Sequence, residues 1–190
     1  VATEQALTVQ IPREATRRLL TRVPARYAAT MDEVLLAALA AAVGAWHRAA
    51  GRVGGDEGAP VLRDLEGPGR EEAVAGVDLS RTVGWFTSLC PVRLDAGPLD
   101  WDGFRAGGPE VDRVVARVQA ALRALPDGGI GYGLLRYLNP ETAPRLAGRA
   151  RPQVLFNYLG RFAAAGPSAG GREGGAGEGG ADPGADHEAA

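Results

Sequence analysis

The chain has 190 residues, 45% of them hydrophobic, which is enough for one domain with a substantial core. Its formal net charge of -2 at pH 7 gives no electrostatic reason to bind a polyanion, so nucleic acid is not an expected partner. The single cysteine, Cys90, excludes an internal disulfide, and two histidines far apart in sequence, His47 and His187, give no support to a metal site.

A short strand and a helix are predicted near the start of the chain. The first residues mix polar and apolar side chains, unlike a signal peptide. Apolar and polar residues alternate over residues 7–11, which predicts a strand with one buried face. Pro12 suits the first position of a helix, which the apolar spacing predicts over residues 13–22. Pro24 is expected to end this helix.

A buried helix is predicted next, over about residues 31–49. It opens with a capping box, in which the Thr30 hydroxyl accepts from the Glu33 amide while the Glu33 carboxylate accepts from the Thr30 amide. The helix is apolar almost all round, which is typical of a buried helix. Its apolar run, residues 34–46, is shorter than the roughly 20 residues of a membrane span. We therefore expect a soluble, cytoplasmic protein without a membrane partner.

Strands and helices alternate along the next hundred residues. The patterns predict strands over residues 60–65, 84–94 and 154–159 and helices over residues 109–125, 132–138 and 141–147. Strands mixed with helices of this length indicate an α/β or α+β sandwich, in which helices pack against one sheet.

The composition changes abruptly after about residue 163. Gly, Ala, Pro, Ser and Glu fill the remainder, with almost no apolar residue larger than alanine. Such a segment cannot bury enough surface to offset its ordering entropy. We therefore predict one folded domain over residues 1–163 and a disordered tail or linker over residues 164–190.

A carboxylate, Glu66, follows the predicted strand at residues 60–65 and stands beside a Gly-Pro-Gly turn. The plain interpretation is a solvated acid at a strand end. The functional interpretation is a catalytic acid or base, because catalytic side chains are often carried on loops that rigid elements hold. Arg70, Glu71 and Glu72 surround the turn with charges of both signs, which can tune such a group, and the sequence leaves open which sign prevails.

A polar and aromatic loop leads into the second predicted strand. Arg81, Thr82, Thr87 and Ser88 could line a channel or pair with an acid, whereas Trp85 could be ordinary core. Residues 129–133, which include Tyr132, form a glycine-rich run. This run lacks the Lys and the Ser or Thr of a phosphate loop, so loop geometry is its plainer role.

Two polar residues, Asn157 and Tyr158, fall in the last predicted strand. Successive side chains of a strand point to opposite faces, so at most one of the two faces a given cavity directly. A buried Asn needs hydrogen-bond partners, so Asn157 is either a structural bracket or a group that orients a substrate.

Taken together, four motifs resemble the epimerization domains of nonribosomal peptide synthetases, which belong to the condensation-domain superfamily. That family carries a Glu-Gly-His-Gly-Arg-Glu element, which resembles residues 66–71. It also carries an Asp-x-Ser-Arg-Thr-Val-Gly-Trp-Phe-Thr-Ser element, matched by residues 78–88. A Gly-x-Gly-Tyr-Gly element and a Phe-Asn-Tyr-Leu-Gly element match residues 129–133 and 156–160.

The resemblance implies one chloramphenicol-acetyltransferase-like lobe, with a mixed sheet and helices packed on it. It also implies inversion at Cα of an aminoacyl or peptidyl thioester, from L to D, by removal and return of a proton. Glu66 would be one acid/base group, Asn157 would hydrogen-bond near the enolate oxygen, and Tyr158 would line the site. The implied substrate channel comprises Arg81, Thr82, Trp85, Thr87, Ser88 and Tyr132. The chain would bind no cofactor itself, because the phosphopantetheine arm of a peptidyl carrier domain would deliver the substrate.

The sequence departs from the family pattern in two respects. The family's second catalytic element, His-His-x-x-x-Asp-Gly, is absent, so the chain resembles a C-terminal lobe whose partner would be the N-terminal lobe of the same domain. Pro68 and Cys90 replace the histidine and the tyrosine that the family has at these positions. Pro68 either stiffens the turn or marks a degenerate site. The alternatives are therefore a non-catalytic remnant or carrier-docking module and, third, half of an amide-forming condensation domain.

Overall fold

The computed structural model describes residues 3–52, 58–67 and 78–160. The chain divides into two compact units, Val1–Tyr158 and Leu159–Ala190, and the architecture below is that of the first. The predicted tail at residues 164–190 and its boundary at residue 163 lie outside the described residues.

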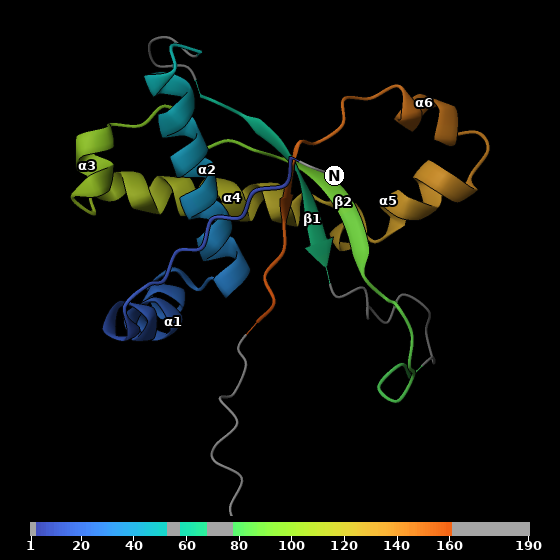
Figure 1. The fold of residues 1–190 in the computed structure, drawn as a ribbon, viewed down its shortest axis with the longest axis horizontal. Helices are drawn as coiled ribbons and strands as arrows, with labels where there is room; N and C mark the ends of the chain where they lie inside the picture. Colours follow the sequence, from blue (N-terminus) through green and yellow to red (C-terminus); the bar gives the residue numbers. More distant parts are fainter. Residues whose placement is uncertain (1–2, 53–57, 68–77, 161–190) are drawn as a thin grey trace, which may run out of the picture. The chain divides into compact units, whose positions relative to one another are not determined.

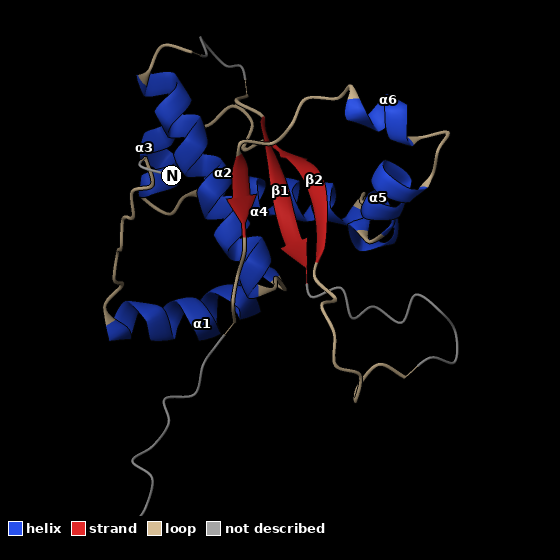
Figure 2. Ribbon diagram, turned by 45° about the vertical axis from the view of Figure 1, so that its right-hand side comes forward, coloured by secondary structure: helices blue, strands red, loops and turns tan. Residues whose placement is uncertain are grey.

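A three-stranded mixed sheet lies at the centre of the first unit (Figure 2). The strand order is β2-β1-β3, with β1 at Val61–Gly67, β2 at Ser88–Leu94 and β3 at Val154–Phe156. The central strand β1 runs antiparallel to β2 and parallel to β3. In this register Leu65 lies between Cys90 on one side and Phe156 on the other. The sheet and its helices confirm the predicted fold class.

Helices surround the sheet on more than one side (Figure 1). They are α1 (Arg13–Tyr27), α2 (Met31–Ala49), α3 (Trp101–Arg105), α4 (Pro109–Arg123), the 3-10 turn η1 (Pro126–Gly129), α5 (Gly131–Gly133), the π-helical turn η2 (Leu134–Leu138) and α6 (Ala143–Ala147). Helices α2 and α4 pack on one face of the sheet and form the core with β2. The segment from α5 to α6 lies beside β2, away from α2 (Figure 2).

The core joins the apolar stripe of α4 to α2 and to the inner face of β2. Val114, Val115 and Val118 are buried in α4, as the spacing of residues 109–125 predicts. They meet Leu36 of α2 and Leu94 of β2 in one cluster. Removing this apolar area from water is the main favourable contribution to folding.

The predicted capping box at the start of α2 is present. The Thr30 hydroxyl accepts from the Glu33 amide at 3.2 Å, and the Glu33 carboxylate accepts from the Thr30 amide at 2.9 Å. Both bonds satisfy donors that the first helical turn would otherwise leave unpaired. The cap therefore fixes where α2 begins and how its first turn enters the core.

Replacing Thr30 by Ala is expected to lower the free energy of unfolding by about 1 kcal/mol, because one capped amide loses its acceptor. Urea denaturation followed by circular dichroism measures this change. The control is Thr8→Ala, at an exposed residue outside any helix or strand. Equal losses in the two variants would contradict a role for the cap.

Two predictions at the start of the chain are wrong. Residues 7–11 form no strand, and Leu7 is 91% exposed, because alternation alone supplies no partner strand and no apolar surface to cover. Pro24 does not end α1, which continues to Tyr27. A proline within a helix removes one donor and crowds the preceding turn, but its carbonyl remains an acceptor. The Pro24 carbonyl accepts from the Ala29 amide at 3.0 Å and so closes the last turn of the helix.

The other element boundaries differ by a few residues. Strand β2 begins at Ser88, not at residue 84, and Trp85 in the preceding loop is 89% exposed. The last strand ends at Phe156, not at residue 159. In both places the predicted residues lie beyond the ladder that β1 forms among the described residues.

A buried arginine, Arg63, stands on the core face of β1 and is fully enclosed. It donates from Nη2 to the Leu39 carbonyl at 3.3 Å, while its Nε and Nη1 have no partner among the described residues. Burial lowers the pKa of its guanidinium. A desolvated cation with unmet donors opposes folding.

Replacing Arg63 by Met is therefore expected to raise the free energy of unfolding by about 1–2 kcal/mol, because an apolar side chain of similar length removes the buried charge. Arg93→Met, at an exposed position of β2, is the control and should change stability by less than about 0.5 kcal/mol. Denaturation midpoints in urea compare the two variants. A clear loss of stability in Arg63→Met would show that the guanidinium has a stabilising partner.

Across the described residues, no single helix has the length and apolar character to cross a membrane. Helices α1 and α2 pass this test only when they are taken together, and they meet at an angle of 95°.

Candidate functional site

Glu66 lies at the end of the central strand. It is the second-to-last residue of β1, is half-buried, and pairs across the ladder with Leu89 of β2. The ladder with β2 thus holds the backbone of Glu66 on one side. Residues 68–72 of the adjoining turn, which include Pro68, Arg70 and Glu71, lie outside the described residues.

A cavity of about 280 Å³ opens at this end of the sheet. Its lining comes from the start of α2, all three strands, the end of α4 and the segment that follows it. The lining residues are Thr30, Asp32, Glu33, Leu36, Leu65, Glu66, Gly67, Ser88, Cys90, Leu122, Leu125, Gly128 and Phe156. Three carboxylates therefore border an otherwise largely apolar space, which is an arrangement suited to proton transfer.

The two acids from the first turn of α2, Asp32 and Glu33, differ in their hydrogen bonding. Glu33 is held by two bonds, because it accepts from the Thr30 amide at 2.9 Å and from Gln119 Nε2 at 3.1 Å. Asp32 has no such anchor within the described part of the chain. Burial, and to a lesser degree the charge of Glu33, raise the pKa of Asp32. Asp32 therefore carries a proton at higher pH than an ordinary aspartate, and sequence reasoning missed it.

Asn157 and Tyr158 follow directly after β3. Phe156 pairs with Leu65, so Asn157 comes at the register position beside Glu66. Asn157 is exposed and Tyr158 is half-buried. Both residues lie beyond the ladder between β1 and β3. The predicted alternation of their side chains between the two faces of a strand therefore does not apply to them.

The six residues of the predicted channel fall into separate places. Ser88 borders the same cavity as Glu66, since the ladder pairs it with Gly67. Thr87 is half-buried at a neighbouring hollow, whereas Arg81, Thr82 and Trp85 are exposed in the preceding loop. Tyr132 is half-buried and lines a different cavity, with Asp64. The structure thus brings one of the six, Ser88, to the Glu66 cavity.

Cys90 is buried and free. Burial, with a smaller contribution from the charge of Asp64, raises the pKa of its thiol. A thiol that keeps its proton is a poor nucleophile, and this agrees with the interpretation of Cys90 as a small core hydrophobe. Within the described part of the chain, no three His, Cys, Asp or Glu side chains gather as metal ligands do.

The sequence of this chain is similar to a known family of domains and to parts of larger proteins. The family model described as condensation domain matches residues 2–171. The chain is 44% identical over 149 residues to chondramide synthase of Chondromyces crocatus, covering 78% of this chain and 3% of that protein. It is 35% identical over 162 residues to bacitracin synthase 3 of Bacillus licheniformis, covering 85% of this chain and 2% of that protein.

A solved structure resembles the fold as well as the sequence. It is the epimerization domain from the third module of tyrocidine synthetase B, with a TM-score of 0.61 and 35% sequence identity. The match covers 80% of this chain and 30% of that chain. The chain thus spans only a small part of the curated relatives and under a third of the solved domain.

Proposed function

The chain belongs to the condensation-domain family, and we propose that it supplies one acid/base group for inverting Cα of a carrier-bound aminoacyl or peptidyl thioester. The thioester carbonyl makes the α-proton acidic. A base on one face of Cα takes that proton, an enolate-like state forms, and an acid on the other face returns a proton. One C–H bond breaks and one forms, so no oxidant or reductant is needed.

In this proposal Glu66 is the acid or base on its side of the substrate. Asn157, at the register position beside it, donates a hydrogen bond near the enolate oxygen, and Tyr158 lines the site. The second acid/base group belongs to an N-terminal lobe of the same domain, which carries the histidine element of the family. The channel residues Arg81, Thr82, Trp85, Thr87, Ser88 and Tyr132 would then guide the substrate.

One observation carries the proposal: a carboxylate stands at the end of the central strand, on the border of a partly enclosed cavity. The identity of 35% to an epimerization domain supports the assignment of this carboxylate to proton transfer. The carrier domain, with its phosphopantetheine arm, is the proposed partner. The proposed reaction needs no cofactor bound to this chain and would take place in the cytoplasm.

A second candidate is a non-catalytic module that docks a carrier domain. The sequence favours it at one point, because Pro68 stands where the family has histidine. An amide-forming half of a condensation domain is a third candidate, and the description of the matching family model suits it equally.

The three candidates differ in what happens to the α-proton. The chain is mixed with a supplied N-terminal lobe and an aminoacyl carrier in deuterated buffer, and mass spectrometry follows deuterium at Cα. We expect deuterium to enter and the L and D forms to mix. Carrier binding without deuterium uptake would favour the docking module. Amide formation between two loaded carriers would favour the condensation half.

A further inference from the structure

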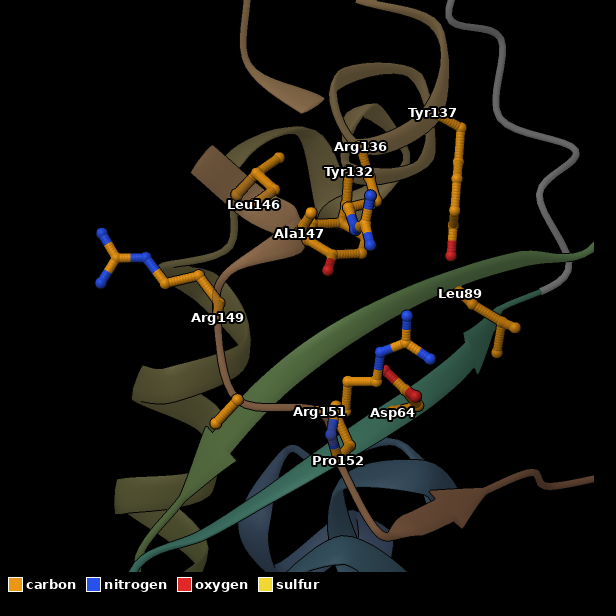
Figure 3. Close-up of a pocket in the computed structure, with 11 residues that line it drawn as sticks. Asp64, Leu89, Tyr132, Arg136, Tyr137, Leu146, Ala147, Arg149, Arg151 and Pro152 are labelled. Atoms are coloured by element: carbon orange, nitrogen blue, oxygen red, sulfur yellow. The ribbon is translucent and has the colours of Figure 1, made fainter. Parts of the chain in front are cut away.

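A second cavity, of about 260 Å³, lies between the sheet and the segment that runs from α5 past α6. The sheet contributes Asp64 of β1 and Leu89 of β2, which point toward the cavity (Figure 3). The remaining lining residues are Tyr132, Arg136, Tyr137, Leu146, Ala147, Arg149, Ala150, Arg151 and Pro152. Strand alternation puts Asp64 on the same face of β1 as Glu66, which lines the first cavity.

The charge that faces this cavity is positive. The guanidinium groups of Arg136 and Arg151 lie on opposite sides of the cavity, whereas that of Arg149 points away (Figure 3). Asp64 is the lining carboxylate. Among the described residues, the groups that face inward therefore sum to two positive charges and one negative charge, a net charge of +1.

Within the described part of the chain, neither inward-facing guanidinium has a close acid. Across residues 3–52, 58–67 and 78–160, no carboxylate oxygen lies within 4.0 Å of a nitrogen of Arg136 or Arg151. Arg136 instead stacks over the ring of Tyr137, with 5.1 Å to the ring centroid. The N–H donors of the Arg136 and Arg151 guanidinium groups are thus available to an anion.

Two tyrosines complete the polar lining. The hydroxyl groups of Tyr132 and Tyr137 both point toward the strands, on either side of the Arg136 guanidinium (Figure 3). A phenol hydroxyl donates to an anionic oxygen without adding charge. Two guanidinium groups and two hydroxyl groups therefore converge on one space.

We propose that this cavity binds the phosphoryl group of a phosphodiester, the one that joins a phosphopantetheine arm to its carrier. Guanidinium forks match phosphate oxygens in pairs, and the inward-facing positive charge attracts the anionic oxygens of a diester and those of the monoester that serves as its probe. The volume falls below the roughly 300–1,000 Å³ of pockets that enclose a whole small molecule, so it suits one group of a longer ligand. That a carrier delivers this phosphate rests on the proposed function; anion binding itself does not.

The test is a titration of the 190-residue chain with pantetheine 4′-phosphate at low salt, followed by calorimetry. Pantetheine without phosphate and inorganic phosphate are titrated in parallel. We expect pantetheine 4′-phosphate to bind most tightly, and binding to weaken as salt rises. Arg136→Gln and Arg151→Gln should each weaken it about tenfold, because each removes a charged hydrogen bond.

The matched control is Arg145→Gln, at an exposed residue of α6 that does not line the cavity. Its affinity for pantetheine 4′-phosphate should equal that of the unmodified chain. Equal affinities for pantetheine and its phosphate, or an unchanged affinity in both cavity variants, would overturn the proposal. Inorganic phosphate binding as tightly as pantetheine 4′-phosphate would overturn the assignment to the arm.

The titration is independent of catalysis. Glu66→Gln should lower the rate of proton exchange by a factor of about 10²–10⁴ and leave phosphate affinity unchanged. Loss of exchange activity therefore tests the proposed function, while loss of phosphate affinity tests this cavity.

Discussion

Replacing Glu66 by Gln is expected to lower the rate of α-proton exchange by a factor of about 10²–10⁴, the usual contribution of one acid/base group. The amide keeps the size and polarity of the side chain but cannot accept a proton at neutral pH. The half-buried strand position should tolerate the change, so the melting temperature should stay nearly constant. Deuterium uptake at Cα, measured with a supplied N-terminal lobe, gives the rate.

Two further variants sharpen this test. Glu141→Gln removes a carboxylate at an exposed residue that precedes α6 and borders neither cavity, so it should leave the exchange rate unchanged. Asp32→Asn removes a second carboxylate of the Glu66 cavity. Unlike Glu33, Asp32 has no hydrogen-bond partner among the described residues. Exchange that survives Glu66→Gln but disappears in Asp32→Asn would transfer the acid/base role to Asp32.

Replacing Gly129 by Ala is expected to destabilise the fold by about 2–6 kcal/mol. Gly129 has a φ of +90°, which an L residue rarely adopts, and it is buried. A Cβ added there would also lie 2.8 Å from the Cys90 Cβ and closer still to its sulfur. Backbone strain and overpacking each contribute about 1–3 kcal/mol. The free energy of unfolding in urea measures the sum.

The neighbouring glycine separates these two effects. Gly128 has a φ of +62°, and a Cβ there would meet nothing within 4 Å, so Gly128→Ala should cost only about 1–2 kcal/mol of backbone strain. Adding Cys90→Ala to Gly129→Ala should recover part of the loss, because the sulfur is gone, and a double-mutant cycle gives that coupling. Equal losses in the two glycine variants would contradict the close contact with Cys90.

Local patterns predicted the elements that form the core and failed where an element depends on a distant partner. Helices α2 and α4 were confirmed because the capping box of α2 and the apolar stripe of α4 are properties of each segment itself. The strand predicted at residues 7–11 was wrong because a strand also needs a neighbour, which alternation does not reveal. The burial of Arg63 was not foreseen, since an arginine in a strand is normally exposed.

The sequence predicted the part of the candidate site that lies on β1, but not the part that α2 contributes. The position of Glu66 at a strand end followed from the apolar run and the turn beside it. The presence of Asp32 at the same cavity did not, because it depends on where the first turn of α2 meets the end of β1. The capping box was recognised only as a helix start, although the same feature brings two acids to the cavity.

Pro91 in β2 has a consequence for how the sheet can grow. In the described chain, β2 and β3 are the outer strands, and Pro91 lies midway along β2, opposite Asp64. A proline has no N–H to donate, so proteins tolerate it in a strand whose free side needs no partner. An added strand would therefore find an interrupted row of donors along β2. Pairing of a further strand along β2, by another lobe or a second molecule, is therefore disfavoured at Pro91.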